Sequence, residues 1–265
     1  MENALINIDS KYRNKIIYPN AGKFSIKLGD KLKNVEYIKI TSIEFPNFYY
    51  TFEQKKNNTS FIININSNSY IVQISNGNYT NTSLINKINN ILTSLSLPTF
   101  NFNDNNLLKI IHSNNFTLDF STFNIYESLG TILGFSNNIY NSQYDNINNN
   151  YYIQAENQLN IPNDNYIFIR INDYGIIYNT DKILDKYIQL DTSYRLNKNT
   201  YLGKIILNKK NEYVYDNKNF ITKQYIFRQR VNIDRFDIEL LDPYFNTIDM
   251  NNLDYSLTLE LGYLI

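Results

Sequence analysis

The residues that could do chemistry in this chain are one histidine and a short run of carboxylates. His112 is the only histidine, and because an imidazole titrates near neutral pH, it is a candidate general base. It follows a predicted strand at 107–111 and precedes two asparagines, which favours a polar side chain at a strand end. A single histidine excludes a His-x-x-x-His zinc site and leaves any Ser-His-Asp triad dependent on this residue.

Four acids, Asp234, Asp237, Glu239 and Asp242, lie close together near the C-terminus. Asp237 and Glu239 fall on one face of a predicted strand, with their Cα atoms roughly 7 Å apart. That separation would suit a glycosidase pair or a site for a hard cation. Arg235 lies on the same face, so we favour a solvated sheet face whose charges neutralise one another.

Other chemical motifs are absent from the sequence. Asp181 and Asp185, in a predicted loop, lack the glycine and the acid spacing of a calcium loop. The chain has no cysteine, which excludes disulfides, thiolate metal sites and cysteine nucleophiles. Its eight glycines form no phosphate-binding motif. We therefore expect no enzyme: no catalytic residue, no cofactor and no bound metal.

The composition argues against two classes of partner. Across 265 residues, 25 basic and 25 acidic residues give zero formal net charge, so no basic field exists to hold a nucleic acid. The N-terminus lacks the pattern of a signal peptide, and the apolar runs are too short to span a bilayer. The 24 tyrosines and 16 phenylalanines are strand-forming residues.

Strict alternation of apolar and polar residues predicts strands at both ends of the chain. Two strands are expected between 233 and 265, joined by a turn at Asp242-Pro243, and they either pair or cross between sheets. In a predicted strand at 34–45 the alternation slips by one residue between Ile40 and Ile43, which predicts a bulge or a change of the buried face. Further strands are expected at 23–28, 61–65, 70–74, 107–111, 116–120, 166–171, 175–178, 201–207 and 224–231.

Residues 60–136 read as a β-β-α-β-β-α module inserted in a β chain. An apolar stripe from Leu84 to Leu95 predicts a helix, capped by Thr80, Asn81 or Thr82. A short second helix is expected at about 126–133 and ends at Gly134. The Asn-rich residues 137–150 read as a linker or loop.

The predicted fold class is mainly β. Residues 23–59 and 137–265 are expected to form a jelly-roll (Greek-key) β-sandwich, although another Greek-key topology fits the pattern equally well. Residues 1–22 are either an N-terminal arm or a first strand of the main sheet, and the sequence leaves both open.

Several local patterns follow one another along the chain. They are Ile8-Asp9-Ser10-Lys11-Tyr12-Arg13-Asn14, Phe24-Ser25-Ile26-x-Leu28, Asn34-Val35 through Ile43-Glu44-Phe45-Pro46, Gly77-x-Tyr79-Thr80, Leu84-Ile85-x-x-Ile88-Asn89, Leu133-Gly134-Phe135, Phe236-x-Ile238-x-Leu240 with Asp242, and Ser256-Leu257-Thr258-Leu259. In this order the patterns resemble the penton (vertex) and related minor capsid proteins of nucleocytoplasmic large DNA viruses and their virophages. One departure is Tyr244-Phe245 after Asp242-Pro243, where a glycine is expected in the turn.

This resemblance implies a structural virion protein: a jelly-roll subunit of a homopentamer at the five-fold vertices, made in the host cytoplasm, with the 60–136 module projecting outward. Its expected partners are copies of itself, the major capsid protein and other minor capsid proteins. The module is a candidate for contact with a host-surface glycan or a fibre. Interface residues are then expected at Ile6, Ile8, Tyr12, Arg13, Tyr49, Tyr50 and Arg235.

Two alternatives remain open from the sequence. One is a minor capsid or cement protein elsewhere in the virion. The other is a carbohydrate-binding or glycan-hydrolysing module that uses surface tyrosines with Asp237 and Glu239.

Overall fold

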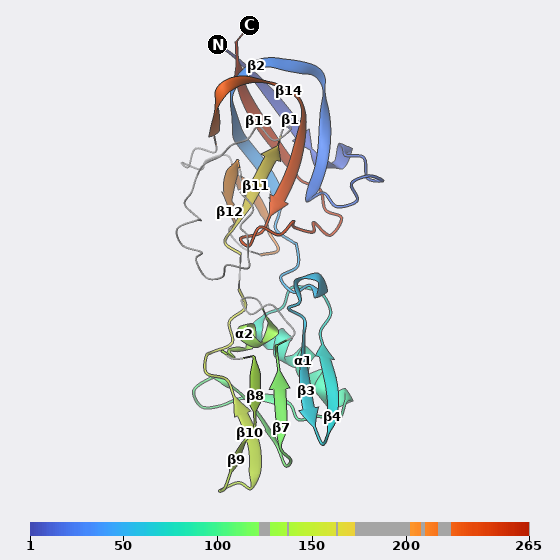
Figure 1. Ribbon diagram of the computed structural model, residues 1–265, viewed down its shortest axis with the longest axis vertical. Coiled ribbons are helices and arrows are strands. Elements are labelled where there is room, and N and C mark those ends of the chain that lie inside the picture. The colour runs from blue at the N-terminus through green and yellow to red at the C-terminus, as the bar shows by residue number, and fades with distance from the viewer. Residues whose placement is uncertain are drawn as a thin grey trace. The chain divides into compact units, whose positions relative to one another are not determined.

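The computed structural model describes residues 1–121, 128–136, 138–162, 164–172, 202–207, 210–216 and 224–264. The chain divides into two compact units (Figure 1). The first combines Met1–Tyr49 with Asp164–Ile265, and the second is Tyr50–Asn163, which extends beyond 60–136 at both ends. The predicted strand at 175–178, together with Asp181 and Asp185, lies outside the described residues.

The first unit is built on one antiparallel sheet with the order β1-β15-β2-β14-β11-β12, and β13 also pairs with β2. A short 3-10 helix, η1 (Ser10–Tyr12), follows the first strand. The strands are β1 (Glu2–Asp9), β2 (Lys23–Pro46), β11 (Tyr166–Asn172), β12 (Gly203–Ile206), β13 (Tyr213–Asp216), β14 (Gln224–Leu241) and β15 (Ser256–Tyr263).

The long strands β2 and β14 belong to both halves of this sheet. Residues 35–44 of β2 pair with β15, and residues 37–39 also pair with residues 224–226 of β14. Residues 23–35 of β2 pair with residues 231–239 of β14 through several register shifts. The rings of Phe24 and Phe45, one from each end of β2, both contact Tyr255, at centroid distances of 6.1 and 6.4 Å. The two halves therefore face each other across one core, which confirms the jelly-roll type of β-sandwich.

The alternation read at the C-terminus matches the observed burial. Phe236, Ile238 and Leu240 of β14 are buried, as are the three leucines of β15. The two strands do not pair with each other, because β2 lies between them. Period-two patterns set which side chains face the core but not which strands become neighbours.

The predicted slip in 34–45 is a β-bulge at Thr41. Thr258 pairs with Ser42 and Leu259 pairs with Ile40, so Thr41 has no partner in the register. Ile40 and Ile43 are both buried although they are three residues apart. The extra residue returns the second half of the strand to the core face.

Residues 1–22 begin with a strand. β1 pairs along its whole length with β15 and forms one edge of the sheet. Of the two interpretations left open by the sequence, the strand therefore describes residues 2–9, and a segment with a 3-10 turn follows it.

The second unit has two four-stranded antiparallel sheets, β5-β6-β10-β9 and β4-β3-β7-β8, around its own core. The linker predicted at 137–150 is wrong, because β8 and β9 lie within it and β10 begins at its end. Their backbone hydrogen bonds extend the two sheets although their side chains are mostly polar. The elements are η2 (Gln54–Lys56), β3 (Ser60–Ile65), β4 (Asn68–Gln73), α1 (Asn81–Ser94), β5 (Phe100–Phe102), β6 (Leu108–His112), β7 (Phe116–Asp119), α2 (Leu129–Leu133), β8 (Ile139–Asn141), β9 (Gln143–Asp145) and β10 (Asn150–Gln154).

Local motifs fix the two helices of this unit. Thr80 caps α1 in a capping box with Ser83. Asn89 exchanges two 2.9 Å hydrogen bonds with the backbone of Phe100, which ties the helix to β5. Gly134 ends α2 with a φ of 95°, and a Cβ there would lie 2.0 Å from the carbonyl oxygen of Asn157. This position therefore requires glycine.

Candidate interaction surface

A buried arginine holds the segment that follows β1. Arg13 is 7% exposed. Its Nε donates to the carbonyl of Tyr18 at 2.8 Å, and its two terminal nitrogens donate to the carbonyls of Ser10 and Pro19 at 2.9 Å each. The guanidinium also forms an ion pair with Asp254. Residues 10–19 therefore curl around one side chain, and we call this arrangement the Arg13 clamp.

Asp254 joins the clamp to the start of β15. Ser10 donates its hydroxyl to Asp254 at 3.0 Å and accepts a 2.8 Å hydrogen bond from the backbone nitrogen of Tyr255. Lys15 lies 3.3 Å from the second carboxylate oxygen. Burial alone would raise the pKa of Asp254, but the hydrogen bonds from Arg13, Ser10 and Lys15 outweigh it and hold the pKa below its usual range.

Short polar side chains shape the backbone on either side of the clamp. The Asp9 carboxylate accepts from the backbone nitrogen of Lys11 at 2.9 Å and caps η1. The Asn14 side chain accepts from the backbone nitrogens of Ile16 and Ile17 at 3.1 and 3.2 Å, which closes a turn. Residues of the Ile8–Asn14 motif thus have structural roles in placing this segment.

The clamped segment presents apolar side chains to solvent. Tyr12 is 76% exposed, Ile16 is 94% exposed and Ile17 is 64% exposed, and Leu5 on the edge strand β1 is 70% exposed. Figure 1 shows the segment as a blue loop that protrudes from the first unit. We call these four residues the N-terminal apolar surface. Contiguous exposed apolar residues mark interaction sites, and the neighbours Ile16 and Ile17 are both exposed in this turn, so we treat it as a candidate binding surface.

The seven residues predicted for an interface differ in their solvent exposure. Ile8 and Tyr49 are 1% exposed, and Arg13 is nearly as buried, so all three contact their own unit. Among the seven, Tyr12 is the side chain that extends into solvent, whereas Ile6, Tyr50 and Arg235 are half-buried. Their contacts with a neighbour stay a prediction.

Tyr49 has a structural position at the boundary of the first unit. Its hydroxyl donates to Asp164 at 2.8 Å, and the ammonium of Lys210 lies 3.2 Å from its ring centroid. Burial raises the pKa of Tyr49 well above its ordinary value. Tyr49 and Asp164 end and begin the two segments of the first unit, so this bond holds together the points where the chain leaves and returns.

The carboxylates Asp237 and Glu239 are partnered on the sheet face. Glu239 forms ion pairs with Arg170 at 2.8 Å and Lys23 at 3.3 Å, and it accepts from the hydroxyl of Thr247 at 2.5 Å. Burial raises the pKa of Glu239, but Thr247 and the two cations lower it overall. Asp237 accepts from Ser25 and lies 3.4 Å from Arg235. Such charge-neutralising contacts do not resemble a glycosidase pair, which needs one carboxyl kept protonated.

His112 lies at the end of β6, where its Nδ1 accepts from the backbone nitrogen of Asn114 at 2.9 Å. It therefore stabilises a turn. Within the described ranges, no group of three or more His, Cys, Asp or Glu side chains has the arrangement of a metal site. Over the same residues, no helix combines the length and the apolar character needed to cross a bilayer.

Sequence reasoning missed Leu5, Ile16 and Ile17 as parts of the N-terminal apolar surface, and it missed Asp254 as the partner of Arg13. The available signal was an isoleucine pair that follows Lys15 and precedes Tyr18 without strand alternation. Asp254 gave no local signal, because its partner Arg13 is 241 residues away.

Comparisons with known proteins identify one family, and the similar solved structures include two viral ones. The model of a family described as "Family of unknown function (DUF5901)" matches residues 1–180. The crystal structure of the mavirus penton protein is similar over 100% of both chains, with 13% identity and a TM-score of 0.48. A chain of the Sputnik virophage structure is similar over 99% of this chain and 98% of its own length, with 10% identity and a TM-score of 0.41. No curated protein matches the chain.

Proposed function

The chain belongs to the family of unknown function DUF5901, and we propose from its own geometry that it is a structural capsid subunit that assembles through its N-terminal apolar surface. The observation that carries the proposal is the Arg13 clamp with Tyr12, Ile16 and Ile17 exposed around it. The candidate pair Asp237 and Glu239 forms ion pairs with basic side chains, and His112 stabilises a turn, so these three side chains have structural contacts.

The clamp supports assembly because it removes the entropy cost of ordering a binding segment. A disordered arm would lose conformational freedom on binding, whereas a segment already held by Arg13 and Asn14 loses little. Each large aliphatic side chain moved from water into an interface contributes about 1.5–3 kcal/mol. Ile16 and Ile17 together would therefore contribute about 3–6 kcal/mol to each subunit contact.

The finer proposal is a penton subunit at a five-fold vertex. A contact between the N-terminal apolar surface and a different face of the next copy is head-to-tail, and such contacts close into a ring when the rotation from copy to copy completes a full turn. The order of motifs along the chain supports this role. In this proposal the chain lies in the virion, and its partners are other capsid proteins. A minor capsid or cement protein would use the same surface at another position in the particle, which a particle map distinguishes.

The test is the oligomeric state of the purified full-length chain, measured by native mass spectrometry and by electron microscopy of negatively stained particles. We expect ring-shaped oligomers of the wild type. The double variant Ile16→Asn/Ile17→Asn should remain folded and lose at least about 100-fold in assembly affinity, because about 1.4 kcal/mol corresponds to a factor of ten.

The matched control is Ile147→Asn, which changes an isoleucine that is 90% exposed on the second unit. This variant should assemble like the wild type. A chain that stays monomeric at every concentration, or rings that form equally well in the double variant, would contradict the proposal.

A further inference from the structure

The second unit contains a pocket of about 410 Å³ at the junction of its two sheets. The pocket lies beside β8, which is an edge strand of one sheet, and beside β9 and β10 of the other. Its volume falls in the range of small-molecule sites, roughly 300–1,000 Å³. The lining residues are Leu107, Tyr140, Asn141, Gln143, Tyr152, Ile153, Gln154, Ala155 and Glu156.

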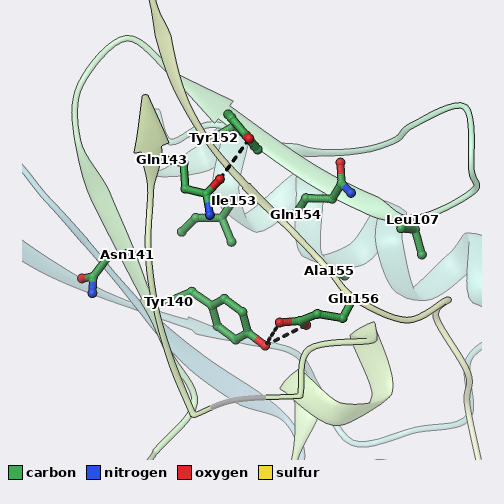
Figure 2. Close-up of a pocket in the computed structure, with 9 residues that line it drawn as sticks. All are labelled: Leu107, Tyr140, Asn141, Gln143, Tyr152, Ile153, Gln154, Ala155 and Glu156. Carbon is green, nitrogen blue, oxygen red and sulfur yellow. Dashed lines mark hydrogen bonds between the residues drawn. The ribbon is translucent and has the colours of Figure 1, made fainter. Parts of the chain in front are cut away.

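Two hydrogen-bonded pairs fix polar groups at opposite sides of the pocket (Figure 2). On one side, the Tyr140 hydroxyl lies 2.8 Å from each carboxylate oxygen of Glu156. On the other, the Tyr152 hydroxyl donates to the side-chain oxygen of Gln143 at 3.0 Å. Ile153 forms an apolar part of the wall between them.

A neighbouring side chain packs against each of the two tyrosine rings. The Tyr140 ring packs edge-on against Phe135 at a centroid distance of 5.0 Å. The Lys109 ammonium lies over one face of the Tyr152 ring, 4.3 Å from its centroid. The aromatic groups are therefore preorganised, and a ligand would not need to order them.

Two carboxamides that line the pocket are available to a ligand. The side chains of Asn141 and Gln154 have no hydrogen bond to any described residue. Each amide offers two donors and one acceptor in a plane, which matches the paired hydroxyl groups of a sugar ring. The apolar C–H face of a sugar packs well against an aromatic ring, whereas its hydroxyls need such planar partners.

The charge of the pocket selects among polar ligands. Among the described residues, Glu156 is the one charged side chain in the lining. Lys109 is outside the lining, with its ammonium over the Tyr152 ring. A carboxylate repels phosphate, sulfate and sialic acid, and a nucleic acid would need basic groups for its backbone. From this combination we propose that the pocket binds a neutral mono- or disaccharide unit of a glycan. The site stands on the second unit alone and does not depend on the capsid role.

The test uses the purified full-length chain on an array of neutral oligosaccharides with galactose, glucose, mannose, fucose and N-acetylglucosamine termini. The array also carries sialylated and sulfated oligosaccharides and single-stranded DNA. The best-binding neutral oligosaccharide is then titrated by calorimetry against three variants of the pocket region.

We expect Tyr152→Ala to weaken binding about tenfold or more through loss of the aromatic contact, and Asn141→Ala/Gln154→Ala to weaken it by a similar factor. The matched control is Tyr144→Ala, which removes an exposed tyrosine on β9 that packs on Tyr151 outside the pocket. It should bind like the wild type. Because the side chains of Asn141 and Gln154 have no hydrogen-bond partner among the described residues, their double variant should keep the melting temperature of the wild type.

Three results would overturn the proposal: no binding to any neutral oligosaccharide, binding only to acidic sugars or DNA, or neutral binding that the pocket variants leave unchanged. Binding that is lost in the pocket variants and kept in Tyr144→Ala would support it.

Discussion

Replacing Arg13 tests whether one buried side chain holds the N-terminal segment. In Arg13→Ala, three hydrogen bonds from the guanidinium to carbonyls are lost, each contributing about 1.5–3 kcal/mol. The ion pair with Asp254 is also lost, and breaking a buried pair costs about 3–5 kcal/mol. Asp254 keeps 26% of its side chain exposed, so water compensates part of this loss. These contributions overlap because one guanidinium makes all the contacts, so they do not add. We expect the free energy of unfolding of the first unit to fall by about 3 kcal/mol, the lower end of the range for a broken buried pair.

Arg13→Lys gives a graded version of this change. Lysine keeps the charge, but its compact ammonium cannot reach the three carbonyls and the carboxylate that the planar guanidinium contacts. We expect the free energy of unfolding of Arg13→Lys to fall by roughly half as much as that of Arg13→Ala. For a unit of this size, about 3 kcal/mol corresponds to a fall of roughly 6–12 °C in the melting temperature.

The assay is hydrogen exchange measured by mass spectrometry, because peptides from 1–49 and 224–264 report on the first unit separately from those of 50–163. The matched control is Arg230→Ala, whose side chain is 55% exposed and pairs with Glu36 at the surface. An exposed pair contributes about 0–1 kcal/mol, so this variant should change little. If Arg13→Ala lowers the free energy of unfolding by the same small amount as Arg230→Ala, the Arg13 clamp does not hold the segment.

Three further predictions concern stability. The pKa values of Asp254 and Glu239 are both lowered in the fold. Their contribution to the free energy of unfolding is therefore present above the unfolded pKa of about 4, and it is lost as the pH falls through the folded pKa values. Urea titrations of the first unit should show its stability falling between pH 7 and 3, and a flat profile would contradict the ion-pair geometry. Gly134→Ala forces a Cβ into the carbonyl of Asn157 at a positive φ, and it should destabilise the second unit by at least about 1–3 kcal/mol. The control Gly77→Ala places a Cβ among ordinary contacts and should destabilise the unit less. Equal melting temperatures of the two variants would count against the role of Gly134. The hydroxyl of Tyr255 is buried without a hydrogen-bond partner among the described residues. Tyr255→Phe should therefore leave the stability of the first unit unchanged or raise it by up to about 1–3 kcal/mol. A clear loss of stability in chemical denaturation would contradict this prediction.

The features that the sequence predicts well are those determined by neighbouring residues. The alternation of Phe236, Ile238 and Leu240, the slip that marks the bulge at Thr41, and the capping of α1 all follow from local periodicity or local hydrogen bonds. The turn after α2 follows in the same way from the conformational freedom of Gly134.

The features that it does not predict depend on contacts between distant residues. The strands β8 and β9 consist mainly of polar residues, so no hydrophobic pattern marks them, and their stability comes from the backbone of neighbouring strands. The Arg13 clamp joins the two ends of the chain, and neither Arg13 nor Asp254 carries a local sign of the other. The exposure of Ile16 and Ile17 becomes evident only once Arg13 is seen to turn the segment outward.

The most direct test of the account is an electron cryomicroscopy map of particles assembled with this chain. The account predicts the first unit repeated around a five-fold axis, with Tyr12, Ile16 and Ile17 covered by the neighbouring copy. It would be contradicted by particles that lack the chain, or by a map in which residues 12–17 face solvent with no subunit against them.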